Sequence, residues 1–191
     1  MALCKIGAVA IPATHMLTAS DIVYRNQRAS VKAIICVNDE FVTTQVREAM
    51  SESPTVEVLV AVNSLAQKGC PVAEGFHDWF TEWEKAPAFV RPEEVNVNED
   101  TMLMYFTSGT SGEPKMVAHD HLYALGHLVT GVFWHNLDED SIHLTVADTG
   151  WGKAVWGKLY GQWFAGATVF VYDHEKFSAE KIMRMMEKYR I

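Results

Sequence analysis

One nine-residue segment combines residue types that could hold a chain of phosphate groups. Residues 107–115 read Thr-Ser-Gly-Thr-Ser-Gly-Glu-Pro-Lys, so four hydroxyl side chains, two glycines and a lysine follow closely on one another. Glycine allows backbone turns closed to other residues and lets backbone N–H groups approach a ligand. The hydroxyls add donors, and Lys115 adds positive charge. Such a loop is suited to bind a polyphosphate through oriented dipoles.

Two other interpretations of this loop were weighed. The P-loop of NTPases requires the pattern G-x-x-x-x-G-K-[ST]. Here Gly109 and Gly112 are three apart, Lys115 follows three later, and Met116 stands where the pattern needs a hydroxyl. The segment therefore does not match the P-loop pattern. The second alternative is an ordinary turn between a strand and a helix, but an ordered series of hydroxyls, glycines and a lysine is unusual for one.

The elements around the loop are predicted from apolar patterning. Five runs rich in apolar and β-branched residues are predicted strands, namely 31–37, 56–62, 102–106, 142–146 and 168–172. Four segments between or after them are predicted helices, namely 18–29, 40–51, 119–134 and 179–189. This alternation predicts an α/β fold with a doubly wound, mostly parallel sheet and helices on both faces. Ligands bind such sheets where strands end, and the loop follows the strand at 102–106.

The composition of the chain argues against some classes of function. The 191 residues suffice for one sizeable domain, and 49% hydrophobic with 21% charged residues is ordinary for a folded protein. A formal charge of −8 without a basic cluster argues against nucleic-acid binding. No apolar run approaches the ~20 residues of a membrane span. The three scattered cysteines, Cys4, Cys36 and Cys70, favour reduced thiols and a cytoplasmic location.

Three segments together resemble the adenylate-forming superfamily, which includes acyl-CoA synthetases, luciferases and the adenylation domains of peptide synthetases. The loop at 107–115 resembles its phosphate loop. Residues 3–25 resemble an early segment, in which a helix end precedes a proline-containing turn. Residues 147–173 resemble a later one, with an Asp-x-Gly-Trp turn and a Gly-Ala-x-x-aromatic strand. Within the superfamily the sequence is most similar to medium-chain acyl-CoA synthetases.

The resemblance implies a reaction in two steps. A carboxylate attacks the α-phosphate of ATP to give an acyl-adenylate and pyrophosphate, and the thiol of coenzyme A then displaces AMP. Magnesium accompanies the ATP. The resemblance implies that one set of residues contacts the phosphates of ATP, namely Thr107, Ser108, Gly109, Thr110, Ser111, Gly112 and Lys115. It also makes Trp151 and Gly152 candidates for the acyl pocket, and a packing role is the alternative for Trp151.

The resemblance also implies that other parts of the active site lie outside these residues. Family members are more than twice this length, and their adenine and ribose motifs and the lysine of a C-terminal domain have no match here. Residues 1–191 are therefore expected to be part of an N-terminal domain and inactive alone. The alternatives are a phosphate- or nucleotide-binding module without catalysis, and a piece of another adenylating enzyme, such as an aryl-acid ligase or a peptide-synthetase domain.

Several other residues invite a functional interpretation that the pattern does not favour. His119 and His121 are two apart, so they would face different directions on a helix, and no H-E-x-x-H motif occurs. A metal site built from side chains alone is therefore not predicted. Trp79 and Trp83 are four apart and would share a helix face, as would Trp156 and Tyr160. Both pairs are expected to pack their helices.

Overall fold

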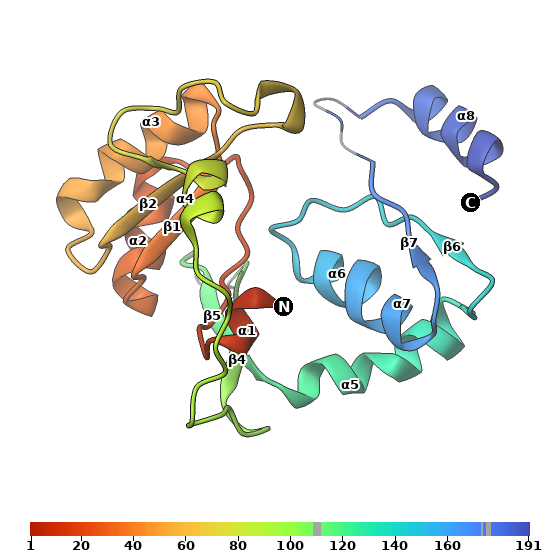
Figure 1. Cartoon of the computed structure of the whole chain (residues 1–191). Coiled ribbons are helices and arrows are strands. Elements are labelled where there is room, and N and C mark those ends of the chain that lie inside the picture. Colours follow the sequence, from red (N-terminus) through yellow and green to blue (C-terminus); the bar gives the residue numbers. More distant parts are fainter. Residues whose placement is uncertain (109–111, 173, 175–176) are drawn as a thin grey trace. The chain divides into compact units, whose positions relative to one another are not determined.

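The computed structural model describes residues 1–108, 112–172, 174 and 177–191 (Figure 1). The chain divides into two compact units, which are described one at a time. Unit 1 comprises Met1–Pro12, Glu94–Tyr105 and Ala118–Ile191, and unit 2 comprises Ala13–Glu93 and Phe106–Val117. None of the helices in the described part of the chain is long and apolar enough to cross a membrane.

Unit 2 is built around a parallel sheet of three strands. The strands are β1 (Ala33–Val37), β2 (Val58–Val62) and β3 (His77–Asp78), in the spatial order β1-β2-β3. The helices of unit 2 are α2 (Ala19–Ala29), α3 (Glu40–Ala49), η1 (Met50–Glu52), η2 (Leu65–Gln67) and α4 (Trp79–Lys85). Figure 1 shows α2 and α3 beside the strands in the orange part of the chain.

Helix α2 begins where the sequence predicts, because its first turn is capped. The Thr18 hydroxyl accepts a hydrogen bond from the backbone N–H of Asp21, and the Asp21 carboxylate accepts one from the N–H of Thr18. This reciprocal pair satisfies donors that the first turn leaves open. The helix buries Ile22, which packs with Val46 and Ala49 of α3. Burial of this apolar stripe fixes which side of α2 faces the sheet.

Unit 1 contains α1 (Ala2–Lys5), the strand pair β4 (Thr101–Thr107) and β5 (Lys115–Asp120), and a group of short helices. These helices are α5 (Leu122–Val129), the π-helical turns η3 (Thr130–Trp134) and η4 (Trp156–Tyr160), α6 (Gly152–Val155) and α7 (Gly161–Phe164). Parallel strands β6 (Ile142–His143) and β7 (Thr168–Val169) and helix α8 (Ala179–Tyr189) complete it. The division between the units passes through β4 and β5.

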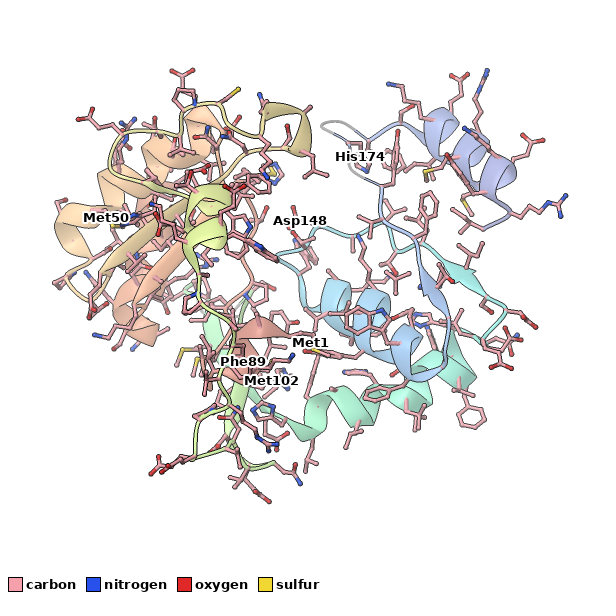
Figure 2. All side chains as sticks on the ribbon, in the orientation of Figure 1. Met1, Met50, Phe89, Met102, Asp148 and His174 are labelled. Carbon is pink, nitrogen blue, oxygen red and sulfur yellow. The ribbon has the colours of Figure 1, made fainter. Side chains whose placement is uncertain are left out.

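Strand β4 supplies the core of unit 1. Its residues Met102, Leu103 and Tyr105 are buried together with Tyr160 of η4. Met102, labelled in Figure 2, also accepts a backbone hydrogen bond from Ala10 N of 3.0 Å. The helices pack closely because glycines meet, since a Cβ on Gly131 would lie 2.2 Å from the carbonyl oxygen of Gly161. No larger residue fits at that crossing.

The α/β class with parallel strands is confirmed. Its strands, however, form three separate hydrogen-bonded groups, β1-β2-β3, β4-β5 and β6-β7, where a single sheet was predicted. The prediction of a helix from His119 is wrong at its start, because His119 and Asp120 belong to β5 and the helix begins at Leu122. After the loop the chain returns beside β4, so these residues complete backbone hydrogen bonds there instead of opening a helix.

Candidate functional site

The ends of the 107–115 loop are held together by the strands that flank it. Thr107 is the last residue of β4 and Lys115 the first of β5, and these two strands pair. The Thr107 hydroxyl donates a hydrogen bond of 3.4 Å to the carbonyl oxygen of Lys115. The structure therefore brings two of the predicted phosphate contacts together. The loop connects two paired strands, so a strand and not a helix follows it directly.

The described residues of the loop are open to solvent. Thr107, Ser108, Gly112 and Lys115 are all exposed. Gly112 has a φ of +100°, and no heavy atom lies within 4 Å of a Cβ placed there. Glycine is therefore required at this position by the backbone conformation and not by space. The other three predicted contacts lie outside the described residues, namely Gly109, Thr110 and Ser111.

Helix α2 of unit 2 contacts both ends of the loop. The Tyr24 hydroxyl donates a hydrogen bond of 2.9 Å to the carbonyl oxygen of Pro114. The Tyr24 ring lies edge-on to Phe106, with centroids 6.1 Å apart, and the Arg25 guanidinium lies 5.3 Å from the Phe106 centroid. The sequence alone does not predict these contacts, because Tyr24 lies 90 residues before Pro114 and no local pattern links the two.

A cavity of about 650 Å³ lies between α2, α3 and the second half of the loop. Its lining includes four carboxylates, those of Asp21, Glu48, Glu52 and Glu113. Hydrogen bonding by the Thr18 side chain lowers the pKa of Asp21, so that carboxylate is ionised near neutral pH. An acidic lining repels phosphate. The acidic cavity itself is therefore unsuited to hold a polyphosphate.

The second group of predicted residues lies in a tight turn of unit 1. Asp148, labelled in Figure 2, accepts a hydrogen bond of 2.7 Å from Gly150 N through its carboxylate. Its carbonyl oxygen accepts one of 3.1 Å from Trp151 N. This is the self-bonding turn that aspartate favours. Trp151 caps α6 and its side chain is 68% exposed, so it does not pack in the core of its unit.

Gly152 lies against the ring of Tyr105. A Cβ at residue 152 would be 3.7 Å from that ring, which is ordinary van der Waals contact. The larger aliphatic side chains would extend into the ring from there. Gly152 therefore lies directly against the Tyr105 ring. Trp151 and Gly152 belong to unit 1 and the loop to unit 2, so the two groups are described separately.

A continuous line of aromatic side chains runs through unit 1, and we call it the aromatic row. Its members, in order of contact, are Tyr105, His119, Tyr123, His127, Trp156, His135 and His143. Trp156 is sandwiched, with ring centroids 5.7 Å from His127 and 5.9 Å from His135. Trp156 and Tyr160 thus pack as predicted, since Tyr160 is buried.

Burial sets the protonation of the row. It lowers the pKa of His127, His135 and His143 below the usual value, and neighbouring ionisable groups add to the effect. Burial likewise raises the pKa of Tyr105 and Tyr123. His127, His135 and His143 are therefore neutral near pH 7. Among the described residues, no group of three or more His, Cys, Asp or Glu side chains could hold a metal ion.

A second cavity, of about 480 Å³, adjoins the end of this row in unit 1. Its lining includes His135, His143, Lys153 and Trp156.

In unit 2, Trp79 and Trp83 share a face of α4 as predicted, with centroids 5.9 Å apart. The pair packs ring against ring at the surface.

Comparison with known proteins adds three findings. Residues 1–191 match the family described as "AMP-binding enzyme". The chain is 30% identical over 193 residues to the mitochondrial acyl-coenzyme A synthetase ACSM3 of Mus musculus, covering 100% of this chain and 32% of that protein. It is 32% identical over 192 residues to the uncharacterized acyl-CoA ligase YtcI of Bacillus subtilis, covering 100% of this chain and 34% of that protein.

Solved structures share the fold. The acyl-CoA synthetase of Brucella canis matches 98% of this chain and 32% of its own, with a TM-score of 0.80 and 20% identity. The anthranilate CoA ligase AuaEII, in complex with anthranoyl-AMP, matches 97% of this chain and 34% of its own, with a TM-score of 0.81 and 21% identity. The chain thus spans about a third of the length of the proteins it matches.

Proposed function

Because the chain belongs to the family of AMP-binding enzymes, we propose that it forms part of an ATP-dependent acyl-CoA ligase. In the first step a carboxylate oxygen attacks the α-phosphorus of ATP, and pyrophosphate leaves with the pair of electrons from the broken P–O bond. In the second step the sulfur of coenzyme A attacks the acyl carbon and AMP leaves. The products are an acyl-CoA, AMP and pyrophosphate.

The observation that carries the proposal is the exposure of the two paired ends of the segment 107–115. Its exposed hydroxyls at Thr107 and Ser108 and the ammonium group of Lys115 stand at the paired ends of β4 and β5. Phosphoryl transfer depends mainly on positioning and on neutralising charge. We propose that this loop holds the β- and γ-phosphates and stabilises the charge that develops on pyrophosphate. The rest of the loop, Gly109 to Ser111 with Gly112, would add backbone and hydroxyl donors.

Magnesium would enter with ATP. The described residues offer no group of His, Cys, Asp or Glu side chains for the ion, so no residue of this chain is assigned to it. When bound to ATP the ion would neutralise phosphate charge. Every role proposed for this chain is therefore one of binding and orientation.

We propose that Trp151 and Gly152 border the pocket for the acyl group. The exposure of Trp151 supports this assignment. A medium-chain fatty acid is the proposed substrate, because the sequence resembles medium-chain acyl-CoA synthetases; the relatives are named as acyl-coenzyme A synthetases. An aromatic acid is the alternative, because one structural neighbour is an anthranilate CoA ligase.

We further propose that residues 1–191 form part of an N-terminal domain and are inactive alone. The proteins that match are about three times as long. The adenine and ribose motifs expected of the family have no match in this chain. A cytoplasmic location is proposed from the scattered thiols, although the mammalian relatives are named as mitochondrial.

The experiment is carboxylate-dependent exchange of labelled pyrophosphate into ATP, catalysed by the complete protein that contains this chain. The acids compared are straight-chain acids from butanoate to decanoate, benzoate and anthranilate, and the proteinogenic amino acids. Exchange with a fatty acid and formation of its CoA thioester would support the proposal. Exchange only with amino acids, or only with aromatic acids, would mean that this class of acid is the substrate and not a fatty acid. ATP binding without exchange for any acid would favour the non-catalytic module.

A further inference from the structure

We propose that Tyr24 of α2 is a positioning residue for the ATP-binding loop at 107–115. This inference rests on the proposed function and adds a residue from a different part of the sequence. Tyr24 does not need to touch ATP, because it would act by holding the two ends of the loop. All of the contacts that carry the proposal lie within unit 2.

The first contact fixes the end of the loop that carries the charge. The Tyr24 hydroxyl donates its hydrogen bond to the carbonyl oxygen of Pro114, at 2.9 Å. That carbonyl belongs to the peptide bond between Pro114 and Lys115, and a peptide bond is planar. Fixing the oxygen therefore fixes the plane from which the Lys115 backbone starts. The direction in which the lysine leaves the strand depends on this bond.

The second contact fixes the beginning of the loop. The Tyr24 ring meets Phe106 at 71°, which is the favourable edge-to-face arrangement, and Phe106 immediately precedes Thr107. The Arg25 guanidinium lies over the ring of Phe106 as well. One tyrosine side chain thus contacts residues on both sides of the loop, eight positions apart in the sequence.

The helix that carries Tyr24 is itself well fixed. Ile22 and Asn26, two residues to either side, are buried. The Asn26 amide donates a hydrogen bond of 3.0 Å to the Ser53 hydroxyl, which in turn donates one of 2.7 Å to the carbonyl of Ala49 at the end of α3. A side chain can only position a loop if its own backbone is held. Here buried contacts on the same helix hold it.

The ring of Tyr24 is also covered from solvent on one side. The Arg28 guanidinium lies 5.7 Å from the centroid of the ring. The pKa of Arg28 is raised, chiefly by the Tyr24 side chain and in smaller part by the Glu113 carboxylate of the loop. Arg28 therefore favours the observed position of the Tyr24 ring.

A loop with two glycines has many conformations to lose when it binds phosphate. Contacts that restrict it beforehand reduce that cost and improve binding. A neutral hydrogen bond of this kind corresponds to about a two- to tenfold effect on an equilibrium or rate. The expected signature is a weaker interaction with ATP, while the carboxylic acid binds unchanged.

The test uses the complete protein with Tyr24→Phe, which keeps the ring contact and removes the hydroxyl. Tyr24→Leu removes both. The matched control is Gln27→Met, which removes a hydrogen bond of 3.0 Å that the same helix donates to the carbonyl of Glu52 and not to the loop. The measurements are KM for ATP, KM for the acid, the exchange rate, the melting temperature, and hydrogen–deuterium exchange of peptides that cover residues 106–116.

Tyr24→Phe should raise KM for ATP or lower the exchange rate by about two- to tenfold, with KM for the acid and the melting temperature unchanged. Tyr24→Leu should change KM for ATP or the pyrophosphate exchange rate by more than Tyr24→Phe does. Both substitutions should speed hydrogen–deuterium exchange in the loop. The inference fails if Tyr24→Phe matches Gln27→Met in ATP kinetics and loop exchange while Lys115→Ala impairs adenylation. If Lys115→Ala has no effect either, the loop assignment itself is wrong. Hydrogen–deuterium exchange of the loop tests the positioning role independently of catalytic activity.

Discussion

Replacing Trp151 with leucine separates a role in the acyl pocket from a role in packing. The side chain is 68% exposed, so about a third of its surface is buried. If full burial covers up to about 250 Å², that third is ~80 Å² and contributes ~2 kcal/mol at about 25 cal/mol per Å². Leucine retains part of this contact. The expected loss of stability is therefore about 1 kcal/mol.

The effect on substrate choice should be larger than the effect on stability. Leucine removes most of an aromatic wall, and each methylene group in an apolar pocket is worth about 1–3 kcal/mol in discrimination. The ratio of kcat/KM between octanoate and butanoate should therefore change by about tenfold or more. The assay is adenylation of both acids by the complete protein, with a thermal melt on each sample.

Trp83→Leu is the matched control, since Trp83 is 67% exposed and lies in the other unit, on α4. It should cost a similar small amount of stability and leave acid preference unaltered. A destabilised Trp151→Leu protein with the original preference would refute the pocket assignment. The same holds if both variants shift preference equally, because the shift would then not depend on the position of Trp151.

The remaining predictions concern titration and thiol chemistry. Because burial lowers the pKa of His127, His135 and His143 while the unfolded chain takes up protons, the melting temperature should fall as the pH drops from about 7 to about 5.5. His143→Phe should flatten this dependence and the exposed His77→Phe should not; equal slopes would contradict the reasoning. Burial raises the pKa of Cys36 to about 11, two units above 9.0. Alkylation at pH 8 should therefore modify exposed Cys70 first and Cys36 about a hundredfold more slowly; comparable rates in the folded protein would disprove the burial of Cys36.

Local signals in the sequence predicted the elements well where capping and periodicity agree. Thr18 with Asp21 marks the start of α2, and the apolar run up to Val37 becomes β1. The start of the helix after the loop was misplaced. His119 and Asp120 carry no strand signal of their own, and they join β5 because a non-local partner, β4, lies beside them. Pairing between distant residues overrides local propensity.

The same distinction applies to the candidate site. The hydroxyl and glycine pattern at 107–115 is contiguous in sequence, so it could be found without a structure. Tyr24 is 90 residues away from Pro114, and nothing in its own neighbourhood indicates a contact with that carbonyl. The aromatic row is equally non-local, since Trp156 meets His127 and His135 from a different helix. Such contacts depend on packing and not on local pattern.

Replacing Lys115 with methionine tests the central claim most directly. In the complete protein, kcat/KM for ATP in the adenylation step should fall by about 10²–10³-fold, the usual loss when one donor to a developing charge is removed. Lys181→Met, on the exposed surface of α8, serves as the control and should leave the value unchanged. If Lys115→Met keeps the original kcat/KM for ATP while the protein remains folded, the loop at 107–115 does not hold the phosphates.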